Sequence, residues 1–212
     1  EKEDLLMIFR DADKIVVCSN IGVKANPSIE VSNDLLNIVY LGRIAKIKNI
    51  DFIIRTLSHI KNDVVLNIFG PIEDNQYWEN CQALCNSLSE RVRINYFGAI
   101  DHHEVRAILS DNDLLFYPSS SENFGHVIFE SLSVGTPVLI SNGTPWTNLE
   151  TKGLGFNFDL TNMDSFVTVI QKFSQYSKVE KIASRKKVVS YITENDLNED
   201  AVNAQHEAFR TL

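Results

Sequence analysis

Cysteine is scarce in this chain of 212 residues, which contains only Cys18, Cys81 and Cys85. Their number is odd, and no two of them form a Cys-x-x-Cys pair. Cys81 and Cys85 stand one helical turn apart, so they are either half of a metal site or two small packing residues. We favour packing, because no His or Cys pair at ligand spacing completes a site. This cysteine usage indicates a reducing compartment, and we expect a cytoplasmic protein.

The chain also lacks long apolar runs and an excess of positive charge. None of its runs approaches the roughly 20 residues that a membrane-spanning helix requires. Lys and Arg number 20 against 28 Asp and Glu, for a formal net charge of -8, which argues against non-specific binding of nucleic acid. The chain opens Glu1-Lys2-Glu3-Asp4, with no initiator methionine and no signal-peptide core. We therefore expect it to be a piece of a longer protein.

What the chain does contain is typical of a globular protein. Hydrophobic residues make up 44% and charged residues 23%, which excludes wholesale disorder and collagen-like or coiled-coil structure. A chain of this length forms one large domain or two small ones. It buries roughly 70% of its extended surface, which is enough for a core without disulfide bonds.

Six short apolar runs follow one another through the middle of the chain, and most lack strict alternation, as in strands covered on both faces. The runs are Ile38–Leu41, Val64–Phe69, Val92–Phe97, Leu114–Tyr117, Pro137–Ile140 and Gly155–Phe158. Stretches of helical period lie between them, at Ile50–Leu57, Asn80–Leu88, His103–Leu109 and Phe124–Val134. This alternation predicts an α/β fold, a Rossmann-like, doubly wound parallel sheet of six strands over residues 37–160.

The two ends differ from this middle part. Residues 1–36, with a possible helix at Asp4–Phe9 and a strand at Ile15–Cys18, read as a linker and the edge of a missing amino-terminal domain. Residues 161–212 carry no strand signal and are expected to be wholly helical. A basic cluster lies there: Lys178, Lys181, Arg185, Lys186 and Lys187. It either contacts anionic lipid or is a solvated helix face, and we favour the solvated face because the surrounding chain is acidic.

In an open parallel sheet the ligand lies beyond the carboxyl ends of the strands, so the loops there are the place to look for chemistry. After the first strand, Gly42 allows a tight exit. Arg43 and Lys48 then precede a helix, where they either converge on a phosphate or are ordinary surface charges. After the second strand, Gly70 lets a ligand approach the backbone.

The third strand is followed by Asp101, which we expect to cap a helix. His102 and His103 come next and superficially resemble a metal-binding pair. Adjacent residues of a helix point to different sides, so we interpret both as surface residues of the first turn. No metal site is expected.

The loop after the fourth strand is the most informative. A helix is expected to start near Phe124, with Ser121, Glu122 or Asn123 as its cap. Gly125 lacks a side chain where this helix begins, which exposes backbone amides to an anion.

Two acids of this segment, Glu122 and Glu130, are eight residues apart, a little over two helical turns, so both are expected to border one cleft. Glu130 lies on an otherwise apolar helix face, where a charge needs a partner. A ribose diol is one fitting partner. The alternative is that the two are a capping acid and a member of a partly buried salt bridge.

Further signals occur at fixed places along the same strands: Leu41-Gly42-Arg43 before Lys48, Phe69-Gly70, Phe97-Gly98, Pro118-Ser119 before Glu122-x7-Glu130, and Gly135-x-Pro137-Val138. Together they resemble the carboxyl-terminal, donor-binding domain of GT-B glycosyltransferases in the large retaining family four, also called group 1. The resemblance covers about residues 37–160. A fainter match, Ile15–Val23, resembles the interdomain linker.

The sequence departs from the family after the fifth strand, where members usually carry Gly-Gly and a Pro-Glu pair. This chain has Asn142 to Glu150 there. Trp146 either replaces a backbone contact or covers the donor cleft, and we do not assign Glu150 to the family's acid. His126 stands where members often carry an apolar residue.

The resemblance implies transfer of a sugar from a nucleotide diphosphate donor with retained configuration and without a bound metal or cofactor. The catalytic residues it implies are Glu122, Arg43 and Lys48. The donor-binding residues it implies are Gly42, Gly70, Ile100, Asn123, Phe124, Gly125, His126, Val127 and Glu130. Arg43 and Lys48 would neutralise the diphosphate, Glu130 would accept from the ribose, and Glu122 would bind the sugar hydroxyls. Backbone groups near Ile100 would hold the base.

The same resemblance implies partners that this chain does not encode. The acceptor would be a glycan or a lipid-linked molecule of polysaccharide or lipopolysaccharide synthesis, bound by an amino-terminal domain. The full-length protein would then be a cytoplasmic enzyme of hexosyltransferase type, with a possible peripheral contact at the inner face of a membrane. A helix at Glu199–Arg210 would cross back to that domain, and the chain alone would be inactive.

Two other functions stay open at this point. One is a sugar-nucleotide epimerase of the same GT-B architecture, which would convert a free nucleotide sugar without an acceptor. The other is a non-catalytic, flavodoxin-like binding module. A receiver-type module would need clustered acids after the first strand and an Asp after the third, and the sequence has neither.

Overall fold

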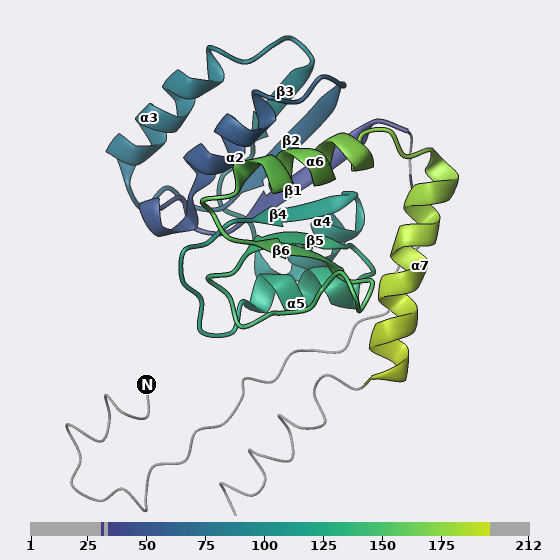
Figure 1. Cartoon of the computed structure of the whole chain (residues 1–212). Helices are drawn as coiled ribbons and strands as arrows, with labels where there is room; N and C mark the ends of the chain where they lie inside the picture. Colours follow the sequence, from purple (N-terminus) through teal and green to yellow (C-terminus); the bar gives the residue numbers. More distant parts are fainter. Residues whose placement is uncertain (1–30, 32–33, 196–212) are drawn as a thin grey trace, which may run out of the picture. The chain divides into compact units, whose positions relative to one another are not determined.

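A parallel sheet of six strands in the order β3-β2-β1-β4-β5-β6 forms the centre of the part of the chain that the structure describes (Figure 1). The structure is a computed structural model, and it describes residues 31 and 34–195. The strands are β1 Leu36–Leu41, β2 Val64–Phe69, β3 Val92–Tyr96, β4 Leu114–Tyr117, β5 Val138–Ser141 and β6 Gly155–Phe158. The order reverses between β1 and β4, as in a doubly wound Rossmann-like sheet, and the predicted fold class is confirmed.

All six predicted strands are present: β2, β4 and β6 have the predicted boundaries, and those of β1, β3 and β5 differ by one or two residues. The largest extension is at β1, which starts at Leu36 because that side chain is fully buried and paired with Val64 of β2. The central strands β4 and β5 are buried along their whole length. Burial on both faces explains why their sequences do not alternate.

Helices cover both faces of the sheet (Figure 1). The helix α2 (Ile50–Leu57) contacts α3 (Asn75–Cys85) and α6 (Met163–Phe173), and these three lie on one face. On the other face α4 (Val105–Ser110) contacts α5 (His126–Ser133), which in turn contacts α7 (Lys178–Glu194). The short turns η2 (Lys46–Lys48) and η3 (His102–Glu104) precede α2 and α4.

Helix α3 begins five residues before the predicted Asn80. Asp74 caps it, because its side chain accepts a hydrogen bond from the backbone N–H of Tyr77 at 2.9 Å. Cys81 of this helix is fully buried in the core, and Cys85 donates its thiol to the Cys81 carbonyl. Burial raises the pKa of the Cys81 thiol to about 11. The packing interpretation of these two cysteines is confirmed.

The prediction that the basic cluster of α7 is a solvated face is wrong for two of its members. Lys181 is 3% exposed and Arg185 2% exposed. Lys181 donates to the carbonyl of Leu35 at 2.7 Å and to Asp113 at 2.9 Å. Arg185 donates to the carbonyls of Ser110 and Asn112. These acceptors precede β1 and β4, so α7 crosses the amino ends of the sheet, and its cations bind carbonyl and carboxylate groups there.

The predicted domain limits stay a prediction. The described residues 31 and 34–194 belong to one compact unit, and α6 buries Phe166 and Ile170 in the same core as the strands. The predictions for Asp4–Phe9, Ile15–Val23 and Glu199–Arg210 lie outside the described residues. Within the part of the chain that the structure describes, no helix has both the length and the apolar character needed to cross a membrane.

Candidate functional site

Two loops meet at the carboxyl edge of the sheet, one after β1 and one after β4. Asn49 links them, because its side-chain amide donates to the carbonyl of Pro118 at 2.8 Å and to the hydroxyl of Ser120 at 2.7 Å. The backbone N–H of Ser120 donates to the carbonyl of Ile47 at 2.9 Å. Asn49 adopts a left-handed conformation, with φ of 54°, between η2 and α2. The two loops are therefore held as one surface.

This junction brings Lys48 and Glu122 together as an ion pair. Their side chains are only 10% and 16% exposed. Glu122 also accepts a hydrogen bond from the hydroxyl of Tyr117 at 2.6 Å. Burial alone would raise the pKa of Glu122, but the hydrogen bonds from Lys48 and Tyr117 outweigh it and hold the pKa below its usual value. Glu122 is therefore a charged carboxylate in a partly desolvated place.

A pair of stacked tyrosines lies beneath this ion pair. The rings of Tyr40 and Tyr117 are 5.8 Å apart, and the hydroxyl of Tyr40 donates to the carbonyl of Arg43 at 2.7 Å. Gly42 lies against them, since a Cβ atom at this position would be 3.1 Å from the Tyr40 hydroxyl oxygen. Gly42 thus allows the strand exit to pack on the tyrosines.

Arg43, predicted to act beside Lys48, pairs instead with Glu73 in the loop after β2. The two side chains are 60% and 48% exposed. An exposed pair of this kind contributes little to stability. Arg43 can therefore change partners at low cost, whereas Lys48 is held in place.

The predicted cap of α5 is wrong. The helix begins at His126 rather than near Phe124, and Gly125 is its N-cap with φ of 76° and no capping side chain. Glu122 cannot cap the helix because its carboxylate is bound by Lys48 and Tyr117. A Cβ atom on Gly125 would lie 2.8 Å from Cδ1 of Ile128, which explains the glycine. A helix start without a capping side chain suits an anion.

Glu122 lies in the loop and Glu130 on α5, so the distance between the two acids is not set by a helical repeat, and the cleft that they are expected to share stays a prediction. Glu130 is 21% exposed at its side chain, and its carboxylate is 3.8 Å from Nδ1 of His102. Burial raises the pKa of Glu130, and the charges of His102, His126 and Arg106 oppose that rise. His102 is thus a neighbour of this acid in the structure, and the predicted pairing of Glu130 with a ribose stays a prediction.

Trp146 packs against Phe124 of the loop between β4 and α5. The indole N–H of Trp146 donates to the carbonyl of Phe124 at 2.6 Å, and the two rings are 5.8 Å apart. The Phe124 ring lies 4.9 Å from that of His126. Asn123 and His126 are exposed, and Val127 is buried. Trp146, a departure from the family pattern, therefore holds the segment that leads into α5.

Gly70 and Ile100 follow β2 and β3. Gly70 has φ of 138°, and a Cβ atom there would lie 2.0 Å from the carbonyl oxygen of Gly42. Ile100 is half-buried against the core. Next to it, Phe97 is 56% exposed and stacks on Phe69 at 4.6 Å. Sequence reasoning missed this stacked aromatic pair, although both phenylalanines precede a glycine at a strand exit.

We expect Gly70→Ala to lower the free energy of unfolding by about 2–4 kcal/mol, because the new methyl group meets the Gly42 backbone in a conformation that disfavours side chains. Gly98→Ala is the matched control, since Gly98 has φ of 78° and a methyl group added there would meet nothing within 4 Å beyond its chain neighbours. Urea unfolding of both variants measures the difference. Equal losses of unfolding free energy in the two variants would show that the positive φ angle, and not the contact with Gly42, causes the destabilisation.

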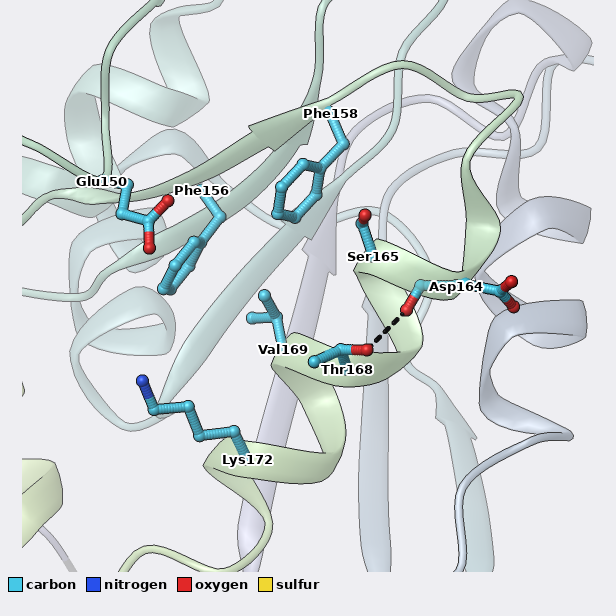
Figure 2. Close-up of a pocket in the computed structure, with 8 residues that line it drawn as sticks. All are labelled: Glu150, Phe156, Phe158, Asp164, Ser165, Thr168, Val169 and Lys172. Carbon is cyan, nitrogen blue, oxygen red and sulfur yellow. Dashed lines mark hydrogen bonds between the residues drawn. The ribbon is translucent and has the colours of Figure 1, made fainter.

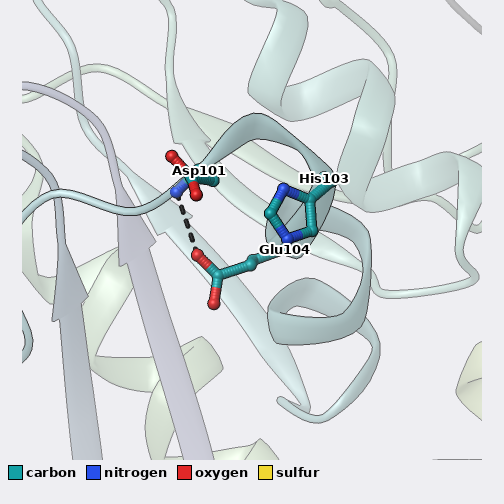
Figure 3. A group of neighbouring side chains, drawn as sticks. All are labelled: Asp101, His103 and Glu104. Carbon is teal, nitrogen blue, oxygen red and sulfur yellow. Dashed lines mark hydrogen bonds between the residues drawn. The ribbon is translucent and has the colours of Figure 1, made fainter.

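Among the described residues, Asp101, His103 and Glu104 form the one group of three whose ligand atoms lie within 4.8 Å of one another (Figure 3). All three are exposed. Asp101 and Glu104 form a capping box, in which the backbone N–H of Asp101 donates to Glu104 at 2.9 Å. Asp101 is thus the predicted cap. His102 faces Glu130 rather than this group, so the two histidines diverge as expected.

A shallow cavity of about 320 Å³ lies between β6 and α6 (Figure 2). Phe156 and Phe158 of β6 and Val169 of α6 line it, with Glu150 and Lys172 at its side. No residue of the predicted site lines this cavity. Glu150 therefore faces a different surface from the Lys48–Glu122 pair.

Comparison with known proteins places most of the chain in one family. A family model described as "Glycosyl transferases group 1" matches residues 24–191. Among curated proteins, an uncharacterized glycosyltransferase of Methanocaldococcus jannaschii is 30% identical over 117 residues, which are 54% of this chain and 29% of that protein. The chain thus spans less than a third of the length of the curated relatives it matches first.

Solved structures show the same fold. The structure of TarM from S. aureus in complex with Fondaparinux, alpha-GlcNAc-glycerol and UDP has a TM-score of 0.77 at 18% identity, over 98% of this chain and 42% of that one. The lipopolysaccharide outer core galactosyltransferase WaaB, in its apo form, has a TM-score of 0.67 at 18% identity, over 100% of this chain and 60% of that one. The likeness confirms the expected Rossmann-like half of a GT-B fold.

Proposed function

Because the chain belongs to the group 1 glycosyl transferases, we propose that it is the donor-binding half of a retaining, metal-independent enzyme. This enzyme moves a hexose from a nucleoside diphosphate sugar to a glycan or lipid-linked acceptor. One observation carries the proposal: the Lys48–Glu122 pair lies at the carboxyl edge of the sheet, in the loops that lead into α2 and α5. TarM, which shares the fold, was crystallised with UDP.

The chemical problem in such a transfer is the negative charge that gathers on the departing diphosphate. Arg43 and Lys48 would neutralise this charge, with the amides at the start of α5 near Gly125 and Val127. Lys48 would leave Glu122 for the phosphate, and the exposed Arg43 would leave Glu73. A preorganised cation in a partly desolvated loop stabilises such charge more strongly than one in water.

The two acids would bind the rest of the donor. Glu130 would accept hydrogen bonds from the ribose, and backbone groups near Ile100 would hold the base. Glu122 would bind hydroxyls of the donor sugar and stabilise an oxocarbenium-like centre. It need not act as a nucleophile, because the acceptor can attack from the face that the phosphate leaves.

Thermal-shift measurements with UDP-, GDP- and ADP-sugars test this function. We expect one nucleotide class to raise the melting temperature in a saturable way, because a ligand that binds only the folded state stabilises it. No stabilisation by any of the three would contradict the proposal. Transfer itself is not expected from this chain alone, since the acceptor would bind to an amino-terminal domain.

Donor binding should not depend on a divalent cation. We expect the same affinity with EDTA and with added Mg²⁺ or Mn²⁺, because side-chain cations and helix amides would take the role of the metal. The carboxylates of the Asp101–Glu104 group are engaged in capping. Titration calorimetry under the three conditions measures this, and a loss of affinity on chelation would show that a metal site was missed.

Glu130→Gln should weaken ribonucleotide binding by about 1–3 kcal/mol, because it removes a charged acceptor for the ribose. It should not lower the melting temperature at pH 7. The raised pKa of Glu130 means that the fold disfavours its charged form, so ionisation costs stability as the pH rises through that pKa. Calorimetry and thermal melts distinguish a role of Glu130 in ribose binding from a role in stabilising the fold. Normal binding with a sharply lower melting temperature would make Glu130 a structural residue.

A further inference from the structure

The last residue of β4, Tyr117, contacts both members of the Lys48–Glu122 pair. Its hydroxyl donates to Oε1 of Glu122 at 2.6 Å, and Lys48 donates to the same oxygen. The Lys48 ammonium nitrogen also lies 5.4 Å from the centre of the Tyr117 ring. One aromatic side chain thus binds the carboxylate through its hydroxyl and the cation through its π face.

The Tyr117 ring has little freedom to move. It is 4% exposed, and it stacks on Tyr40 with 18° between the ring planes. Burial and the hydrogen bond to Glu122 raise the pKa of Tyr117, so its hydroxyl keeps its proton and remains a donor. Tyr40 is equally buried, but its hydroxyl donates to the carbonyl of Arg43 instead.

We infer that Tyr117 is a positioning residue of the donor site, which fixes the Glu122 carboxylate toward the donor sugar while Lys48 engages the diphosphate. The inference rests on the proposed function. The inferred role depends on an exchange of partners, in which Lys48 leaves Glu122 for the diphosphate. When an anion draws Lys48 away, Glu122 loses its cation in a place where it is only 16% exposed. The Tyr117 hydroxyl stays hydrogen-bonded to Glu122, which keeps the carboxylate charged and oriented toward the donor sugar.

The groups around Glu122 agree with this role. Lys48 and Tyr117 donate to it, whereas the Ser119 hydroxyl donates to the backbone carbonyl of Ser121 at 3.0 Å. The charge of Glu122 raises the pKa of Tyr40, and the charge of Arg43 lowers the pKa of both tyrosines. Of the two side chains that donate to Glu122, Tyr117 is the neutral one, and it belongs to a buried strand of the sheet. Its position is therefore set by the sheet, whereas Lys48 comes from the segment after β1.

Tyr117→Phe and Tyr40→Phe form a matched pair of variants. Each removes one hydroxyl from the same buried stack, and only the first hydroxyl touches Glu122. The Glu122 carboxyl is followed by ¹³C NMR over a pH titration of the 212-residue chain. Affinities are measured for UDP-glucose, GDP-mannose and ADP-glucose, and for the corresponding nucleoside diphosphates.

We expect the Glu122 titration to move to higher pH in Tyr117→Phe and to stay in place in Tyr40→Phe. The nucleotide sugar that binds the wild type should bind about tenfold more weakly to Tyr117→Phe, while its nucleoside diphosphate loses less. A purely structural role would lower the melting temperature of both variants alike and leave the Glu122 titration unchanged.

The outcomes separate this inference from the proposed function. If the wild type binds a nucleotide sugar but Tyr117→Phe has the same affinity or the same Glu122 titration, the positioning role is wrong and the donor site stands. If the wild type binds none of the three nucleotide sugars and none of the diphosphates, the proposed function fails and the positioning role fails with it.

Discussion

Replacing Arg43 and Lys48 together with Gln should weaken nucleoside diphosphate binding by about 2–4 kcal/mol and leave nucleoside binding almost unchanged. The contacts to base and ribose are expected near Ile100 and Glu130, so only the diphosphate would lose its partners. The salt dependence of diphosphate affinity should also flatten, because fewer charges take part. Titration calorimetry with nucleoside and nucleoside diphosphate measures both effects.

The two single variants should differ. Lys48 is buried beside Glu122, so Lys48→Gln leaves a carboxylate short of a cation and should also lower the melting temperature. Arg43 is exposed, so Arg43→Gln should weaken binding without that loss. Arg43→Lys should weaken binding as well, because a point charge cannot replace a two-pronged donor.

The control for these variants is Lys46→Gln, an exposed cation in the same loop. It should change neither binding nor stability. Equal losses of nucleoside and nucleoside diphosphate affinity in the double variant would mean that Arg43 and Lys48 shape the fold rather than bind phosphate.

The second large effect is expected at the opposite edge of the sheet. Lys181→Met should lower the free energy of unfolding by about 3–5 kcal/mol, because it leaves Asp113 buried without its cation. Asp113 is 7% exposed, and it would keep the hydrogen bond from the backbone N–H of Asn37 and the nearby charge of Arg185. Denaturant unfolding of the purified chain measures the loss.

Arg185→Ala should have a similar cost, since it removes hydrogen bonds to the carbonyls of Ser110 and Asn112 in front of β4. The control is Lys186→Ala, which removes an exposed lysine from the same helix. A loss no larger than that of the control would mean that α7 is not held by its buried cations.

The strands could be predicted because a strand that is buried on both faces appears in the sequence as a short run of apolar residues. The basic cluster of α7 could not be divided into buried and exposed members, because the cations lie on both sides of a helix with little amphipathic character. Only the position of α7 across β1 and β4 decides that Lys181 and Arg185 are buried.

The candidate site could be predicted as a set of loops but not as a set of contacts. Lys48 and Glu122 are 74 residues apart in the chain, and their pairing depends on the bonds that Asn49 makes between two loops. The cap of α5 was mispredicted for the same reason, because the sequence does not show that Glu122 is bound elsewhere. The glycines and the acids themselves were found from the sequence.

The most direct measurement is an NMR map of nucleotide binding on the isotopically labelled chain. A nucleoside diphosphate sugar that stabilises the protein should shift amide signals of Gly42 to Asn49, of the loop from Pro118 to Gly125, and of the first turn of α5. The amino edge near Lys181 and the β6–α6 cavity should stay unchanged. Shifts confined to those two regions, or no saturable shift with any nucleotide, would contradict a donor site at the carboxyl edge of the sheet.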